Sequence, residues 1–137
     1  MVILLAVSSA ASVTQAQSKF PCRNWLRLAQ GPKLYLLRKF IETAKEDKTI
    51  LRLSAEYYVE ELDKLIRRYA DTENEKALDA PLGLTIHTIA AMEGDWDNGE
   101  DPLEHARKFM GEELFEAFKK MYPEKYKKLV ERSKKKE

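Results

Sequence analysis

The sequence predicts a compact all-α single domain of five to six short helices that follows an N-terminal signal peptide. Three observations predict this fold. The 137 residues are 34% charged and 44% hydrophobic, with only five glycines and five prolines, which is typical of a helical domain large enough to bury one core. Apolar residues recur at spacings of three and four rather than in alternation. Glycine and proline stand where one such run ends and the next begins.

The first residues predict a secretory leader. Met1 to Val7 is an apolar run, small residues and glutamine follow it, and the first charge is Lys19. Thr14-Gln15-Ala16 places small residues at the −3 and −1 positions of a cleavage site. No basic residue precedes the run, as expected where the start of the leader lies upstream or is truncated. The run is too short for a stable membrane span. We therefore expect a signal peptide at 1–16 and a periplasmic or secreted helical domain at 17–137.

The first half of that domain predicts three helices. Residues 23–30 form a short helix that Gly31 ends, and Pro32 then suits a first turn. Residues 32–47 are amphipathic, with apolar residues at Leu34, Leu37, Phe40, Ile41 and Ala44. Residues 48–53 are a connection whose inward-facing side chains are Ile50, Leu51 and Leu53. Ser54 is a good N-cap, and helix 54–70 presents a wide face of Tyr57, Tyr58, Leu62, Leu65, Ile66 and Tyr69.

The second half predicts a loop and then further helices. Residues 71–79 are polar and are expected to be a loop. A helix opens at Pro81, buries Leu82, Ile86, Ile89 and Ala90, and stops near Gly94. The next helix starts with Asp101 as N-cap, Pro102 in the first position and Glu104 completing a capping box. This helix reaches Gly111, and the helical spacing of apolar residues continues beyond it to Tyr122. Pro123 then starts a last, basic helix.

The net charge of +1 hides a segregated charge pattern. Residues 19–53 carry nine bases and three acids, residues 71–105 carry ten acids and one base, and residues 116–137 carry nine bases and four acids. Such a pattern indicates either complementary surfaces within one fold or separate surfaces for partners. The basic end lacks the groups that read nucleic acid, so no nucleic-acid partner is expected.

Cys22 is the only cysteine, so an intrachain disulfide is impossible. A single cysteine in an exported protein is a free thiol, a lipid attachment site or half of an intermolecular bridge. Phe20-Pro21 is a poor lipobox, which disfavours lipidation. A partly buried, inert thiol is the first expectation, and a dimer through Cys22 is the alternative.

Residues 93–101, the acidic turn, form the densest group of side chains with functional chemistry. Calcium binds several oxygens from a tight, glycine-containing loop, and such oxygens are present at Asp95, Asp97, Asn98 and Asp101. The spacing does not match an EF-hand, because two of its ligand positions hold a glycine and a tryptophan. These four residues are therefore the candidate calcium site, and the alternative is a turn that only caps the next helix.

The acidic turn is also the candidate contact surface for a protein partner. Trp96 stands among polar residues, where a large aromatic is either anchored in the core or displayed as a binding hot spot. Trp96, Asp97 and Glu100 are the predicted partner-binding residues. They carry the expectation that the chain acts by binding another protein.

Enzymatic motifs are few. His87 and His105 lack the spacing of a zinc motif, and no serine elbow, phosphate-binding loop or Cys–His pair occurs. Glu93 with Asp95 or Asp97 is the carboxylate pair that a small hydrolase would use. No catalytic residue is assigned, calcium is the one cofactor considered, and the sequence favours a non-enzymatic role while leaving enzymatic activity open.

The layout of residues 22–90 resembles small exported helical proteins, with the Rap1a/Tai immunity group as the nearest named case. The likeness rests on Cys22, Trp25-Leu26, Phe40-Ile41, Ser54, Tyr58, Leu62-Asp63, Tyr69, Asn74 and Ala80-Pro81. The cysteine pattern of that group is not reproduced, and the part from Glu93 onward has no counterpart in it. The resemblance implies a periplasmic protein that neutralises a partner effector by binding.

The predicted function is therefore protein–protein binding by an exported, immunity-like or accessory protein. Two alternatives from other classes remain. One is a binding module that calcium stabilises through the acidic turn, and the other is a small hydrolase with a carboxylate acid or base.

Overall fold

A computed structural model of the chain describes residues 20–136. The predicted signal peptide, residues 1–16, lies outside the described residues. The elements in chain order are η2 (Cys22–Arg27), α2 (Gln30–Glu46), α3 (Ala55–Asp71), α4 (Glu75–Asp79), α5 (Leu82–Glu93), α6 (Pro102–Met121) and α7 (Pro123–Lys136). Between residues 20 and 136 there is no strand, only two isolated bridges. The all-α prediction is confirmed for the described residues, which form one 3₁₀ helix and six α-helices where five to six helices were predicted.

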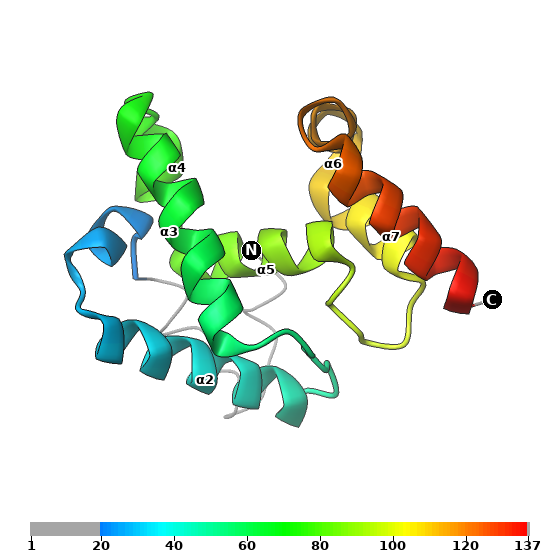
Figure 1. Ribbon diagram of the computed structural model, residues 1–137, viewed down its shortest axis with the longest axis horizontal. Helices are drawn as coiled ribbons and strands as arrows, with labels where there is room; N and C mark the ends of the chain where they lie inside the picture. The colour runs from blue at the N-terminus through cyan, green and yellow to red at the C-terminus, as the bar shows by residue number, and fades with distance from the viewer. Residues whose placement is uncertain (1–19, 137) are drawn as a thin grey trace.

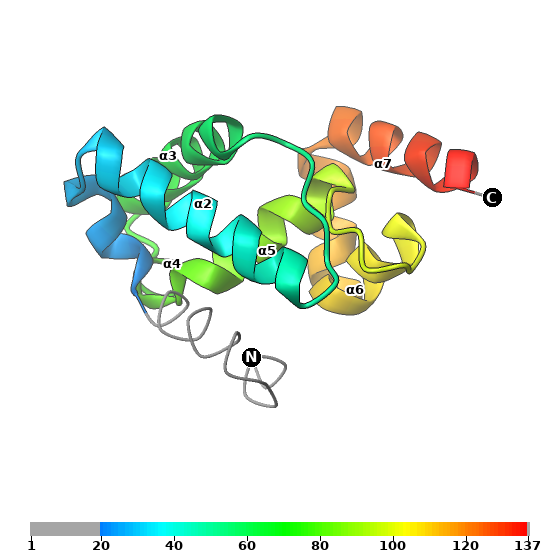
Figure 2. The ribbon, with the colours of Figure 1, turned by 90° about the horizontal axis from the view of Figure 1, so that it is seen from below.

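Helix α5 runs across the middle of the molecule (Figure 1), with η2, α2, α3 and α4 on one side and α6 and α7 on the other. The view from below shows the same division (Figure 2). Most residues of α5 are apolar and buried, as expected of a helix that is covered on both sides. One hydrophobic core lies between η2, α2, α3, α4 and α5 and includes Trp25, Leu37, Phe40, Tyr58, Leu62, Ile66 and Ile86. A second core joins the end of α5 to α6 and α7 and consists of Ala91, Ala106, Phe115, Phe118 and Leu129.

Most of the helix boundaries that local chemistry predicts are confirmed. Ser54 Oγ accepts a hydrogen bond from Tyr57 N at 3.0 Å and caps α3. Asp101 Oδ2 accepts one from Glu104 N at 3.1 Å and caps α6. The break expected at Gly111 is a kink inside α6, with φ 81° and ψ 164°. Ser54 and Asp101 each accept a backbone N–H from the first turn of their helix, and Gly111 takes the backbone out of helical geometry at one residue. The effect of each residue is therefore confined to about one turn.

Three local predictions are wrong. The helix expected at 23–30 is the 3₁₀ helix Cys22–Arg27, which ends where Leu28 and Ala29 become extended, and Gly31 lies inside α2 instead of ending a helix. Residues 71–79 are not simply a loop, because Asn74 Oδ1 accepts from Ala77 N at 3.1 Å and starts the short helix α4. Ile50 does not turn inward and is 40% exposed. Its backbone pairs with Asp97 in both directions, N to O at 2.9 and 3.2 Å. Since extended residues alternate sides, this pairing sends Leu51 into the core and Ile50 outward.

A largely buried ion pair joins Lys33 of α2 to Asp63 of α3. Lys33 Nζ is 2.8 Å from Asp63 Oδ1, and the Lys33 side chain is only 9% exposed. The same oxygen accepts the indole N–H of Trp25 at 2.8 Å. The ammonium also lies 5.3 Å from the Trp25 ring centre. The three side chains join η2, α2 and α3 at one point.

Cys22 is fully buried, which goes further than the partly buried thiol that the sequence predicted. Its sulfur is 3.1 Å from Thr85 Oγ1, and burial raises the pKa of the thiol above its ordinary value. The alternative of a dimer through Cys22 is corrected by this position, because an enclosed thiol cannot meet a second thiol while the core is intact. None of the helices described is long and apolar enough to cross a membrane.

Gly94 ends α5 in the left-handed conformation, with φ 69°. A Cβ added there would lie 3.0 Å from Leu129 Cδ1 and 3.2 Å from Arg132 Cδ. We expect Gly94→Ala to lower the free energy of unfolding by about 2 kcal/mol, because a left-handed alanine is strained and its methyl meets the second core. Urea denaturation measures this loss.

Gly99→Ala is the matched control for that substitution. Gly99 also has a positive φ, 97°, but no heavy atom lies within 4 Å of the added Cβ. It stands in an exposed turn that relaxes more easily, so the loss should be smaller. Equal losses at the two positions would contradict a role for the contact with Leu129.

Candidate functional site

The acidic turn connects α5 to α6 and packs against residues 49–53. Asp95 is 3% exposed. Its Oδ1 accepts from Arg52 N at 2.9 Å. Its Oδ2 accepts from Leu53 N at 3.1 Å and from the Tyr58 hydroxyl at 2.5 Å. Burial, followed by the charge of Asp95, raises the pKa of Tyr58 well above its ordinary value. Asp95 therefore anchors the connection before α3 to the end of α5.

The other predicted calcium ligands have partners of their own. Asp97 Oδ2 is 2.7 Å from Arg52 Nη1, and its Oδ1 accepts from Gly99 N at 3.3 Å. Asn98 exchanges hydrogen bonds with Glu100. Asp101 caps α6 and accepts from the Ser133 hydroxyl of α7.

Across residues 20–136, no group of three or more His, Cys, Asp or Glu side chains is placed to hold a metal ion. The structure therefore does not identify the four residues of the turn as metal ligands. Their observed role is to join α3, α6 and α7 through the turn. The calcium hypothesis stays a prediction from the sequence.

Trp96 is half-buried rather than fully displayed. Its ring stacks on His87 at a centroid distance of 3.7 Å and lies 6.4 Å from the Phe40 ring. Of its predicted companions, Asp97 pairs with Arg52 and Glu100 pairs with Lys108 at 3.2 Å. One face of the Trp96 ring is therefore covered by His87, so less of the ring surface is open to a partner than the sequence suggested.

The structure brings together two histidines that the sequence did not connect. His87 of α5 and His105 of α6, hereafter the histidine pair, have their Nε2 atoms 2.9 Å apart. Their rings are nearly coplanar, 8° apart. The His87 ring is stacked between Trp96 on one side and Phe109, at 3.8 Å, on the other. A signal for the pair was absent from the sequence, because the 18-residue separation crosses a turn and matches no motif.

Burial, and to a smaller extent the neighbouring His105, lower the pKa of His87 to about 3. Burial also lowers the pKa of His105, although Glu100, 3.5 Å from its Nδ1, acts in the opposite direction. The pair is therefore neutral near neutral pH. One Nε2 then carries hydrogen and the other accepts it, as a 2.9 Å contact between two ring nitrogens requires.

Glu93 is joined to a different network from the one proposed for a hydrolase. It accepts from the Tyr57 hydroxyl at 2.6 Å and from Lys125 Nζ, and Lys125 also lies 3.4 Å from Glu61. Burial would lower the pKa of Lys125, but Glu93 and Glu61 raise it above the ordinary value. Burial and the bond to Glu93 raise the pKa of Tyr57 to about 12.

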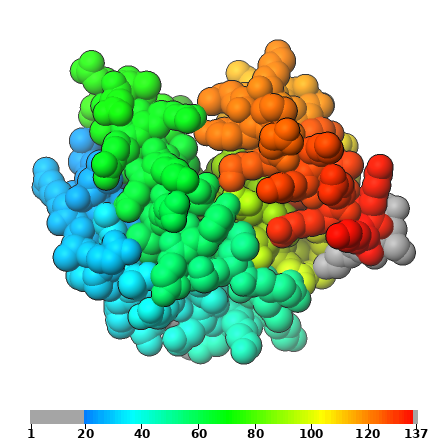
Figure 3. Space-filling view, viewed as in Figure 1, coloured from blue at the N-terminus to red at the C-terminus, as the bar shows by residue number. Residues whose placement is uncertain are grey.

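This network joins α3, α5 and α7 beside the hollow that Figure 3 shows between the α3–α4 side and the α6–α7 side. Arg68 and Tyr122 bridge the same two sides with a 2.8 Å hydrogen bond. Asp95 and Asp97 bond instead to the segment before α3, and their pairing with Glu93 in a hydrolase stays a prediction from the sequence. A catalytic role for Glu93 stays a prediction of the sequence alone.

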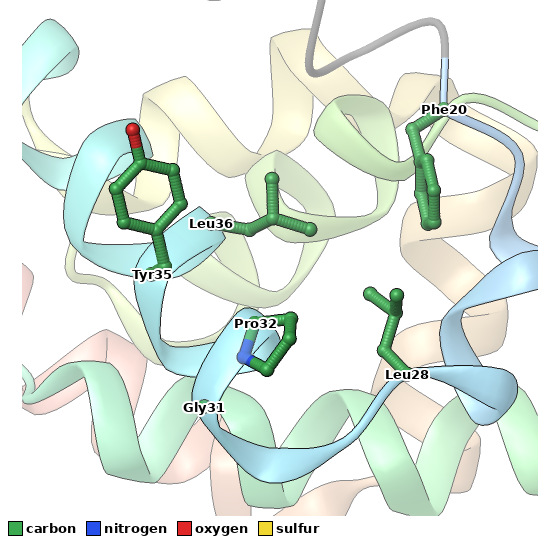
Figure 4. A pocket seen from close by; sticks show the side chains of 6 residues that line it. All are labelled: Phe20, Leu28, Gly31, Pro32, Tyr35 and Leu36. Carbon is green, nitrogen blue, oxygen red and sulfur yellow. The ribbon is translucent and has the colours of Figure 1, made fainter.

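An open apolar groove of about 560 Å³ lies at the start of α2, and the sequence did not predict it. Its lining residues are Phe20, Leu28, Gly31, Pro32, Tyr35 and Leu36. In Figure 4 the side chains of Phe20, Leu28 and Leu36 point toward one space, and Tyr35 stands at its edge. Tyr35 is 59% exposed. Lys39 Nζ lies over the Tyr35 ring, 5.7 Å from the ring centre.

Comparison with protein-family models, with curated proteins and with solved structures gave no significant match. The resemblance to the Rap1a/Tai group therefore stays a prediction from the helix pattern.

Proposed function

We propose that the chain is an exported, non-enzymatic protein that acts by binding a protein partner, and that the apolar groove is its contact surface. The observation that carries the proposal is the groove itself. Six residues without a charged side chain surround an open space on an otherwise highly charged chain. Exposed apolar surface of this kind typically marks an interaction site.

The chemistry of the groove favours side-chain binding over catalysis. Catalysis needs a group that donates, accepts or attacks, and the only polar side-chain atom among the lining residues is the Tyr35 hydroxyl. Apolar anchors from a partner fit such a space, because burying them removes their surface from water. Tyr35, at the edge, is of a residue type that is enriched among binding hot spots.

The charge around the groove indicates the kind of partner. The groove lies in the part of the chain that carries nine bases and three acids, residues 19–53. Arg27 and Arg38 are exposed near its lining residues, and Lys39 lies over the Tyr35 ring. A partner segment with apolar anchors flanked by acidic side chains complements this surface and is steered toward it by the opposite charge.

The proposal is tested by site-specific photo-crosslinking from the groove. A photoreactive phenylalanine analogue replaces Tyr35 in the full chain, which is expressed in its host, and covalent adducts are identified by mass spectrometry. We expect a discrete protein adduct whose contact segment is acidic and apolar. The same analogue at Met121, which is also 59% exposed but lies at the end of α6, should not give that adduct.

Affinity for the captured partner then separates the two candidate surfaces. Tyr35→Ala should weaken binding about tenfold or more, as expected of a hot spot, and added salt should weaken binding further. Met121→Ala is the matched control. Loss of binding in an Asp97→Ala/Glu100→Ala variant, with none in Tyr35→Ala, would move the site to the acidic turn. The absence of any adduct specific to Tyr35 would contradict the proposal.

A further inference from the structure

The histidine pair is the contact between α5 and α6 that depends on protonation. Its two Nε2 atoms face each other at 2.9 Å inside a stack of aromatic rings. This contact is independent of the apolar groove, which lies at the other end of the molecule around η2 and α2.

Only certain protonation states fit this geometry. With both rings neutral, one N–H lies between the two nitrogens. With one added proton a single N–H can still lie between them, because the proton can bind the free Nδ1 of the ring whose Nε2–H donates, while the other ring keeps its bare Nε2 as acceptor. With both rings protonated, each Nε2 carries a hydrogen, and two cations face each other between Trp96 and Phe109. The hydrogen bond is then replaced by repulsion.

We propose that the histidine pair is an acid-sensitive latch between α5 and α6, and that its double protonation releases α6 and α7 from the rest of the molecule.

The packing indicates why α6 and α7 would move together. They share a set of aromatic contacts, in which Tyr126 packs on Phe115 at 6.0 Å and on Phe118 at 6.2 Å. The ammonium that lies over these rings, Lys119 Nζ at 5.6 Å from both Phe115 and Tyr126, belongs to α6 itself and moves with it. The contacts between the pair and the rest of the structure, by contrast, run through Trp96, which packs on Phe40 of α2.

Few other charges act on the pair. Among the described residues they are Glu100, 3.5 Å from His105 Nδ1, and Lys108, which pairs with Glu100 at 3.2 Å. Glu100 favours a first proton on His105 and Lys108 opposes it. Trp96 and Phe109, which cover the two faces of His87, do not titrate and leave that ring without a counterion among the described residues.

The direction of the pH effect follows from the lowered pKa values of the two histidines. Each opened, hydrated histidine binds a proton below about pH 6.5, whereas the closed pair resists protonation. Opening is therefore least favourable above pH 6.5 and becomes easier as pH falls toward about 3, the pKa of His87 in the closed state. For each proton taken up on opening, the opening constant rises about tenfold per pH unit.

Hydrogen exchange of the full chain at pH 7.5 and pH 5, corrected for the intrinsic pH dependence of exchange, tests the latch. We expect amides of α6 and α7 to lose at least tenfold in protection at pH 5, while those of α3 keep theirs. A double variant, His87→Gln/His105→Gln, provides an amide pair that does not titrate and should keep α6 protected. Equal loss of protection in α3, or the same loss in the double variant, would overturn the proposal.

A second measurement needs no substitution. Nuclear magnetic resonance of the imidazole nitrogens follows the protonation of each histidine in the native chain. We expect His87 to stay neutral to below pH 5 in the closed state. Titration of both rings near pH 6.5, with α6 still protected, would show that the pair accepts two protons without opening and would reject the latch.

Discussion

Asp95→Ala should cost about 3 to 5 kcal/mol of unfolding free energy, a large part of the 5 to 15 kcal/mol typical of a domain. The carboxylate is 3% exposed and accepts three hydrogen bonds, from Arg52 N, Leu53 N and the Tyr58 hydroxyl. Removing it leaves three donors without this acceptor, two of them part-buried backbone N–H groups and the third the fully buried Tyr58 hydroxyl, for which a lost partner costs the most. Urea denaturation, followed by circular dichroism, measures the loss.

Two further substitutions in the acidic turn test whether the loss of stability comes from the hydrogen bonds of Asp95. Asp95→Asn keeps the shape but turns one acceptor into a donor, so at least one of the three donors loses its partner, and an intermediate loss is expected. Asp97→Asn removes the negative charge that pairs with the exposed Arg52 and keeps the oxygen that accepts from Gly99 N. It should cost less than about 1 kcal/mol. Equal losses for Asp95→Ala and Asp97→Asn would refute the anchoring role of Asp95.

Asp63→Ala should be the second large effect, with a loss of about 3 kcal/mol. It strands the buried ammonium of Lys33 and removes the acceptor of the Trp25 indole N–H. Breaking one side of a buried ion pair costs more than the pair contributes, because the remaining charge stays in a poor solvent. Chemical denaturation measures the loss.

The stranded charge predicts a rescue. In the Asp63→Ala background, Lys33→Met removes the uncompensated ammonium and replaces it with an apolar chain of similar length. The double variant should therefore be more stable than Asp63→Ala alone, and the coupling between the two sites should be measurable in a double-mutant cycle. If the double variant is the least stable of the set, the ion pair is not the source of the loss.

Local sequence chemistry was enough for most of the helix boundaries. Ser54, Asp101 and Gly94 act on backbone groups within four residues of themselves, so their effect can be read from neighbours in the chain. The short helix α4 escaped prediction because five residues give too little apolar periodicity to detect. Its cap, Asn74, was visible in the sequence but stood in a stretch that looked like a loop.

The candidate sites depended on contacts that the sequence does not encode locally. The acids of residues 93–101 were visible, but Asp95 faces donors more than forty residues earlier in the chain. Trp96 was singled out, yet what covers it is His87, whose own partner His105 lies on another helix. The apolar groove needs Phe20, which precedes η2, to lie beside the first turns of α2.

The sequence by itself determined the all-α class, the ends of the long helices and the segregation of charge. Only the tertiary structure decided that Lys33 is buried, that the two histidines meet and that Asp95 is an anchor rather than a surface acid. The reason is physical. A helix satisfies its backbone within one turn, so its signals are local, whereas burial of a charge or a ring depends on which distant side chains pack around it.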